Sequence, residues 1–543
     1  MSRGVTLAAV GLLLALGGCS VSRGVAKLGA IPGSLGFSNT SQKITTRDEF
    51  ASVKAGRPIT VYAQGERVYQ LPQHALGDTL IRGSGTLQQG HDVSPFTGTI
   101  PFREIIAVKT DSRSAIKGFA LLGITALFVA YAIEASDSHH GMQATEQLGY
   151  RYPGGGVGTS CPYLYAWDGA RYELQAEPFG TAWGRALEQT TLHVLPAVRA
   201  GEGEVRLRLT NERAETHYVN SIQLRAIDLG TAPAAVLDGE GRAWPLSRPV
   251  SPVTARDKTG RDILPEVADA DGRMWECDPS GLTPGSGYED VLEVAFARPR
   301  HASAGSLVLT GINTEISSVM HACLCRLTGD QTALFAHAVE TDPELIAGLR
   351  EYLRDASLKA FVWDGRGWQP AGEFQPEASA VSFTRALRIG FPDGVGDTVR
   401  VRLRGMADVW KIDALSADWG GAQPLPMTPV KLLSATGPAG EDLLSDLEAD
   451  DARYAILLPP DQVDLTFAAG RLEAGRRLAY AAAGRGYLLE WDLPLAEKGS
   501  ASLASLVPEA QRIEFVKELL RHRELALQPM YEEWRKVRAR DHE

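Results

Sequence analysis

Tyr165-Ala166-Trp167-Asp168-Gly169 returns later in the chain as Phe361-Val362-Trp363-Asp364-Gly365. Both stretches are short runs of aromatic and apolar residues that enter an Asp-Gly pair, which is typical of a β-hairpin. Residues 205–209 (VRLRL) likewise match 399–403 (VRVRL), with the apolar–polar alternation of half-buried strands. These paired stretches predict a mainly β protein with an internal duplication.

More matches follow in the same order along the chain. Gly260-Arg261-Asp262 corresponds to Gly440-Glu441-Asp442, and 292–296 (LEVAF) corresponds to 463–467 (VDLTF). The offset shrinks slowly, from 196 residues at the Trp-Asp-Gly pair to 171 at the last strand. Chance matches would not keep this order.

The strands and turns of each copy favour two duplicated β-sandwich units of jelly-roll type. The first is expected at 158–335 and the second at 358–500. Thr341-Asp342-Pro343-Glu344 caps an amphipathic helix predicted at 340–357. Apolar stripes separated by Pro529 predict a C-terminal helical region at 505–543.

A smaller β-domain is expected before the duplicated region. Alternating runs such as 59–62 and 67–71 are separated by turn residues. They predict a β-barrel-like domain at 41–112.

The N-terminus has the features of an exported protein. Arg3 precedes an apolar run and then small residues, so 1–18 is predicted to be a signal peptide. Leu16-Gly17-Gly18-Cys19 resembles the lipobox of bacterial lipoproteins. That resemblance implies acylation of Cys19, and Ser20 after it implies sorting to the outer membrane. Residues 19–40 are rich in Gly and Ser and are expected to be a tether.

A second hydrophobic segment is predicted to be a membrane helix at 114–135. Its uncharged run, 118–133, has 16 residues. That length gives about 24 Å of helix, just under the usual span. The alternative is a buried core helix. The expected partners are therefore membrane lipid, held through acylated Cys19 and this helix, and other envelope proteins. The remainder of the chain would be periplasmic or surface-exposed.

The composition excludes several function classes. The 543 residues are 44% hydrophobic and 22% charged, with a net charge of −11. These values are ordinary for a globular protein and exclude a polytopic membrane protein. Because no basic stripe is present, no nucleic-acid partner is expected. The sequence also lacks the common nucleotide-binding and hydrolase motifs, so no catalytic residue and no cofactor is predicted.

Four cysteines follow Cys19, in a compartment that allows disulfides. Cys161, Cys277, Cys323 and Cys325 are therefore candidate disulfide residues. Cys323 and Cys325 are too close in sequence to pair with each other. The alternatives are buried thiols, or a metal site with His321. A lone Cys-x-Cys lacks zinc-site spacing, so no metal is predicted.

Two tryptophans, Trp363 and Trp368, are candidate sugar-stacking residues. The alternative is that they fill the core of a sandwich. Acidic residues such as Asp168 and Glu177 could serve glycoside hydrolysis if the fold placed two of them face to face.

The stretch 161–172, CPYLYAWDGARY, resembles a Cys-Pro-x-x-Tyr-x-Trp-Asp-Gly signature. That signature occurs in β-rich regions of exported bacterial proteins associated with ASPIC/UnbV and TPR modules. The resemblance implies an uncharacterised envelope lipoprotein and carries no established activity. The expected function is a non-catalytic scaffold or recognition role. The alternative is a glycan-binding or glycan-hydrolysing envelope protein.

Overall fold

The computed structural model describes residues 41–42, 58–110, 162–490 and 511–538, with short gaps inside the last three ranges. This part of the chain is mainly β, as predicted. No helix among the described residues is both long and apolar enough to cross a bilayer. The predicted signal peptide at 1–18, acylation site Cys19 and membrane helix at 114–135 all lie outside these ranges.

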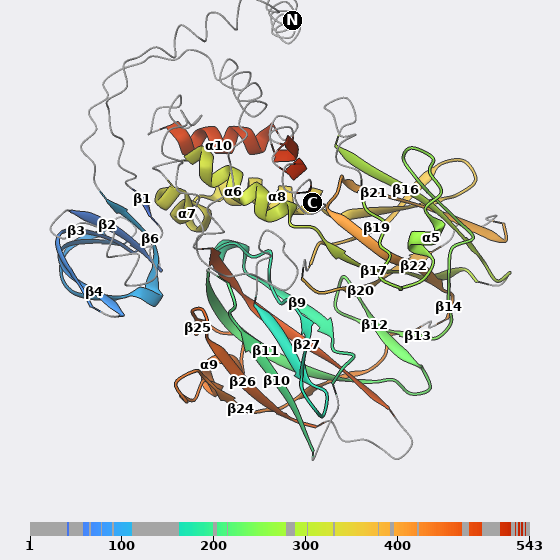
Figure 1. Cartoon of the computed structure of the whole chain (residues 1–543), viewed down its shortest axis with the longest axis horizontal. Coiled ribbons are helices and arrows are strands. Elements are labelled where there is room, and N and C mark those ends of the chain that lie inside the picture. Colours follow the sequence, from blue (N-terminus) through green and yellow to red (C-terminus); the bar gives the residue numbers. More distant parts are fainter. Residues whose placement is uncertain are drawn as a thin grey trace, which may run out of the picture. The chain divides into compact units, whose positions relative to one another are not determined.

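The first sheet is a curled half-barrel with strand order β1-β6-β2-β3-β4-β5 (Figure 1, blue). Alternate side chains of its strands form a separate apolar core, which includes Val61, Leu71 and Ile100. The predicted small β-domain at 41–112 corresponds to this sheet. Its elements are β1 (Ser41–Gln42), β2 (Ile59–Ala63), β3 (Arg67–Leu76), β4 (Leu80–Gln89), β5 (Asp92–Pro101), η1 (Phe102–Glu104) and β6 (Ile105–Thr110).

Two further sheets share one core and are called sheet pair 1. Their strand orders are β24-β26-β10-β7-β8 and β23-β11-β27-β9, with β25 also paired to β11. Leu207 and Phe467 from the first sheet and Tyr218 and Tyr487 from the second lie in this shared core. The elements are β7 (Tyr163–Trp167), β8 (Tyr172–Ala176), η3 (Arg185–Leu187), β9 (Gln189–Val194), β10 (Glu204–Thr210), β11 (Glu215–Asp228), β23 (Met427–Val430), β24 (Leu432–Thr436), α9 (Leu444–Leu447), β25 (Ala455–Leu457), β26 (Gln462–Ala468) and β27 (Leu478–Glu490).

Sheet pair 2 is built in the same way. Its strand orders are β15-β16-β21-β18-β19 and β13-β12-β20-β17-β22-β14. Val294 and Val401 from the first sheet share a core with Leu309 and Ile412 from the second. The elements are β12 (Ala234–Asp238), β13 (Ala243–Leu246), β14 (Pro249–Val250), β15 (Thr254–Asp257), α5 (Leu264–Val267), β16 (Glu289–Ala297), β17 (Ala304–Asn313), β18 (Leu358–Trp363), β19 (Trp368–Phe374), β20 (Phe383–Gly390), β21 (Thr398–Met406) and β22 (Trp410–Asp418).

The two sheet pairs have matching strand orders. The order β24-β26-β10-β7-β8 corresponds strand by strand to β15-β16-β21-β18-β19, and β23-β11-β27-β9 corresponds to β14-β22-β17-β20. The sequence matches occupy equivalent strands, since 205–209 lie in β10 and 399–403 lie in β21. The short helices α5 and α9 also correspond, because Asp262 and Asp442 each accept a hydrogen bond from the backbone N–H two residues later.

The predicted unit boundaries, 158–335 and 358–500, do not delimit the sheet pairs. Sheet pair 1 joins β7–β11 from the first predicted copy to β23–β27 from the second. Figure 1 shows this by colour, with red β27 between green β11 and cyan β9. Sheet pair 2 occupies one continuous stretch, from β12 to β22. Sheet pair 1 therefore combines segments from both predicted units, a pairing that matches in sequence order do not reveal.

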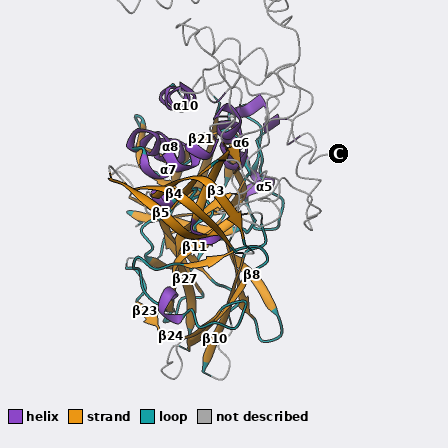
Figure 2. Ribbon diagram, turned by 90° about the vertical axis from the view of Figure 1, so that its left-hand side faces the viewer, coloured by secondary structure: helices purple, strands orange, loops and turns teal. Residues whose placement is uncertain are grey.

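Four helices pack together, as the purple elements of Figure 2 show. The predicted helix at 340–357 is present as α8, whose N-cap Asp342 accepts hydrogen bonds from two backbone N–H groups of the first turn. The others are α6, which falls inside the range assigned to the first sandwich, α7, which begins inside that range and extends beyond it, and α10 in the predicted C-terminal region. The bounds are α6 (Ile316–Thr328), α7 (Thr332–Thr341), α8 (Pro343–Asp355) and α10 (Arg512–Arg521).

Candidate functional site

Both Trp-Asp-Gly stretches form the hairpin turns that were predicted, β7 to β8 and β18 to β19. Asp168 accepts backbone hydrogen bonds from Ala170 and Arg171, and Asp364 accepts the equivalent two bonds in its own turn. These backbone donors lower the pKa of both carboxyls. The two aspartates are therefore turn residues that fix the two hairpins.

Each hairpin carries an aromatic pair covered by an arginine from the next strand. Trp363 and Trp368 meet edge to face with ring centroids 5.4 Å apart, and the Arg402 guanidinium lies 4.2 Å from the Trp368 ring centroid. In the equivalent hairpin Arg208 lies 4.2 Å from the Tyr172 ring centroid. Such arginine–aromatic contacts are attractive because the ring face is electron-rich.

The candidate sugar-stacking residues Trp363 and Trp368 lie on the outer side of their sheet. Both are half-buried, and neither belongs to the buried core of sheet pair 2. Trp410 is different, because it is buried and its indole N–H donates to the carbonyl of Ala356. The core-filling interpretation therefore applies to Trp410 and does not apply to Trp363 or Trp368.

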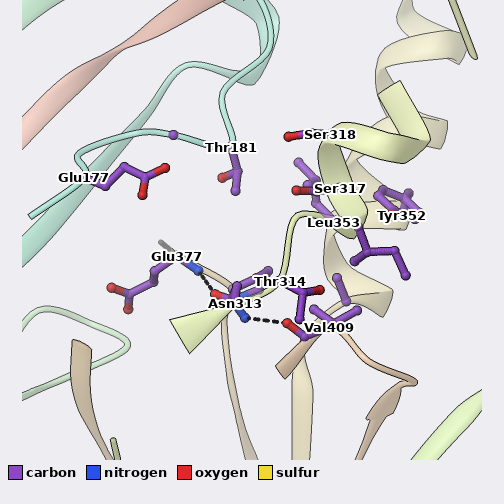
Figure 3. Close-up of a pocket in the computed structure, with 14 residues that line it drawn as sticks. Glu177, Thr181, Asn313, Thr314, Ser317, Ser318, Tyr352, Leu353, Glu377 and Val409 are labelled. Carbon is purple, nitrogen blue, oxygen red and sulfur yellow. Dashed lines mark hydrogen bonds between the residues drawn. The ribbon is translucent and has the colours of Figure 1, made fainter. Parts of the chain in front are cut away.

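An enclosed cavity lies between the loop after β8, the N-terminal turn of α6, α8 and the loop after β19 (Figure 3). Glu177 and Thr181 line it from one side, and Ser317, Ser318 and Glu377 line it from others. Its volume is about 20 Å³, which is room for about one water molecule. A sugar ring does not fit there.

The two glutamates of this cavity are engaged by fixed partners. Glu177 accepts a hydrogen bond of 2.9 Å from the backbone N–H of Ala380. Glu377 forms a two-bond ion pair with the buried guanidinium of Arg385, which also donates to the carbonyl of Leu192 at 2.6 Å. Burial raises the pKa of Glu377, and Arg385 opposes that rise. The bond from Arg385 to Leu192 links sheet pair 2 to β9 of sheet pair 1.

A second buried polar cluster surrounds Asp408, at the turn between β21 and β22. Asp408 is fully buried with a left-handed φ of 55°. Its carboxylate accepts a bond of 2.6 Å from the indole N–H of Trp534 and lies 3.2 Å from the Arg538 guanidinium. Burial raises the pKa of Asp408 to about 7, and Arg538 opposes the rise. The cluster attaches the C-terminal segment to sheet pair 2.

Sequence reasoning missed Asp408, because an Asp in a turn carries no sign of burial. The one signal is Trp534, an aromatic residue within the helical region predicted at 505–543. Trp534 donates to Asp408, which lies 126 residues earlier in the chain, and the spacing of apolar residues around Trp534 does not indicate this partner.

The described cysteines are not joined in disulfides. Cys277, Cys323 and Cys325 are buried thiols, so the predicted disulfides among them are absent from the described structure. Cys325 Sγ lies 3.7 Å from Nε2 of His321 within helix α6. Cys161 lies outside the described residues. No group of three or more His, Cys, Asp or Glu side chains suited to a metal ion occurs among the described residues.

An open groove lies between η3, α8 and the end of β19. It has a volume of about 330 Å³ and is lined by polar side chains of both charges, including Glu188, Arg350, Arg354 and Glu373. This volume is in the range of small-molecule sites. Arg350 donates to the carbonyl of Ala186 at 2.7 Å, which fixes one wall of the groove.

Comparisons with known proteins identify no family for this chain. No family model matches it, and a search of curated proteins finds no match. Among solved structures, the chain is similar to a GH31 alpha-xylosidase from Xanthomonas citri, with 10% sequence identity and a TM-score of 0.16. That match covers 80% of this chain and 38% of the xylosidase. The similarity is too low to carry an argument about fold or activity.

Proposed function

We propose that this chain is a non-catalytic lipoprotein of the bacterial outer membrane, anchored through acylated Cys19, and that its β-rich body serves in recognition. In this proposal the two sheet pairs are β-sandwiches that arose by duplication and exchanged halves. The observation that carries it is the contrast between two places. The two carboxylates have a water-sized cavity and fixed partners, whereas the Trp363–Trp368 pair lies half-buried on the outer face of its sheet, beside Arg400 and Arg402.

The anchor can be tested with the Cys19→Ser variant. Wild-type chain expressed with labelled palmitate is expected to carry the label and to fractionate with the outer membrane. Cys19→Ser is expected to lose the label completely, because the acyl chains are attached through that residue. Cys161→Ser is the matched control and should retain the wild-type label. Label remaining on Cys19→Ser would show that the predicted acylation site is wrong.

Glycan hydrolysis is the second candidate function, because two glutamates, Glu177 and Glu377, line one cavity. Glycosidases need two carboxyl groups about 5–10 Å apart with the sugar between them. A cavity for one water molecule leaves no such room. We therefore expect purified chain to release no sugar from aryl glycosides or envelope polysaccharide. If the wild-type chain does release sugar, and the folded variants Glu177→Gln and Glu377→Gln each lose that activity, the result would favour a glycan hydrolase instead.

A further inference from the structure

The outer face of the sheet β15-β16-β21-β18-β19 combines exposed arginines with half-exposed tryptophans. We call it the arginine face and define it by Trp363, Trp368, Arg400, Arg402, Arg404 and Glu293. Strand β21 alternates strictly, so Val399, Val401 and Leu403 are fully buried while the three arginines point outward. The side chains of Arg400 and Arg404 are 49% and 50% exposed.

The charges on this face are only partly balanced. Glu293 on β16 is shared between Arg400 and Arg402, and Arg404 pairs with Glu289. Lys359 lies opposite Arg404 in the strand register, and Glu373 on β19 lies opposite Lys359. The four cations outnumber the three carboxylates of Glu289, Glu293 and Glu373, so the face carries a small positive charge in a chain whose net charge is −11.

The equivalent face of sheet pair 1 has the same aromatic frame but not the same charge. Strand register places Thr210 where Arg404 stands, and Tyr163 where Lys359 stands. Glu204 on the same strand pairs with Arg206 at 3.6 Å. Thr210 and Tyr163 are also buried, whereas the Arg404 side chain is 50% exposed. At these positions only sheet pair 2 presents cations to solvent.

We infer that the arginine face binds an acidic polysaccharide of the cell envelope. Guanidinium groups bind carboxylate and phosphate oxygens through two parallel hydrogen bonds. Tryptophan offers a large apolar surface with a polar edge, which suits the apolar face of a sugar ring. The inference rests on the proposed function, since an envelope location brings the chain to such a polymer.

Strand β19 connects the arginine face to the open groove. Trp368 begins this strand, and Glu373 near its other end lines the groove together with Arg350 and Arg354. Strands advance about 3.3 Å per residue, so the two ends lie roughly 17 Å apart. A polymer running along β19 would contact both places, which a single small molecule would not.

A lipid surface is a less suitable occupant. Membrane-docking faces expose large apolar side chains that enter the lipid interface. The large hydrophobic residues that are well exposed in the described part of the chain are Val93, Val253 and Leu433. None of them belongs to the strands of the arginine face. The observations therefore favour a polar, acidic polymer.

The test uses the full-length chain with Cys19→Ser, so that the acyl anchor does not contribute. The probe is polygalacturonate, with neutral dextran and vesicles containing phosphatidylglycerol as comparisons, and binding is measured by affinity electrophoresis and vesicle sedimentation. We expect binding to polygalacturonate and none to dextran. Trp363→Ala/Trp368→Ala and Arg400→Gln/Arg404→Gln should each weaken binding about tenfold or more.

The matched control is the equivalent hairpin of sheet pair 1. Trp167→Ala/Tyr172→Ala should leave the affinity within about twofold, and circular dichroism should confirm that every variant is folded. Equal losses in both hairpins, equal binding to dextran, or no binding to polygalacturonate would each overturn the inference. Arginine-dependent binding to vesicles alone would assign the face to lipid instead. Absence of palmitate label from the wild-type chain would overturn the anchor and leave this binding result intact.

Discussion

A fragment spanning 158–335 is expected to remain unfolded, whereas a chain in which 229–426 are replaced by a short Gly-Ser linker is expected to fold. The fragment contains β10 without β26 and β16 without β21, so each sheet loses strands from its middle. The linker variant keeps every strand of sheet pair 1. Ile227 and Met427 face each other in the register of β11 and β23, so a short linker spans the gap.

Far-ultraviolet circular dichroism and urea unfolding will distinguish these outcomes. The linker variant should show a β-type spectrum and one cooperative transition, and 158–335 should show neither. The matched control is a second variant that joins residue 335 directly to 358, which keeps both predicted copies but removes α8 and most of α7. Cooperative unfolding of 158–335 alone would mean that the copies are independent units and that the halves are not exchanged.

The local features could be predicted because they depend on a few neighbouring residues. The two Asp-Gly hairpins, the alternation of 399–403 and the Asp342 cap of α8 each follow from residue type and spacing. The matching of the two copies also follows from sequence order. These features were enough to establish the β class and the correspondence between strands.

Strand pairing between distant segments could not be predicted in the same way. β10 pairs with β26, and the paired residues are 252 or more positions apart. The sequence pattern alone would allow β10 to pair with β16 instead, because β16 has the same alternation of apolar and polar residues. Which pairing forms is decided by the packing of whole faces, and a single sequence does not display that. For the same reason the ion pair of Glu377 with Arg385 and the burial of Asp408 were not foreseen.

The second large effect is expected at Asp408. Its carboxyl faces Trp534 and Arg538 from the C-terminal segment, and Glu276 is also paired to Arg538. The backbone N–H of Asp408 donates to the carboxylate of Asp290 on β16, a further negative charge close by. Burial raises its pKa from 3.8 to about 7 in the folded chain. The folded state therefore holds a proton that the unfolded state releases. The contribution of this proton to the free energy of unfolding is therefore fully present below about pH 4, and it is lost as the pH rises through about 7.

Asp408→Asn removes this titration, because the amide stays neutral at every pH. The free energy of unfolding of the variant, relative to wild type, is expected to increase by about 3 kcal/mol between pH 5 and pH 8. Urea unfolding of both full-length chains at several pH values measures this difference. Trp534→Phe is the matched control, because it removes the indole donor but keeps Asp408, so its unfolding must remain pH-dependent. If the difference between Asp408→Asn and wild type does not change with pH, Asp408 is ionised in the folded chain throughout this range, and Arg538 compensates its burial.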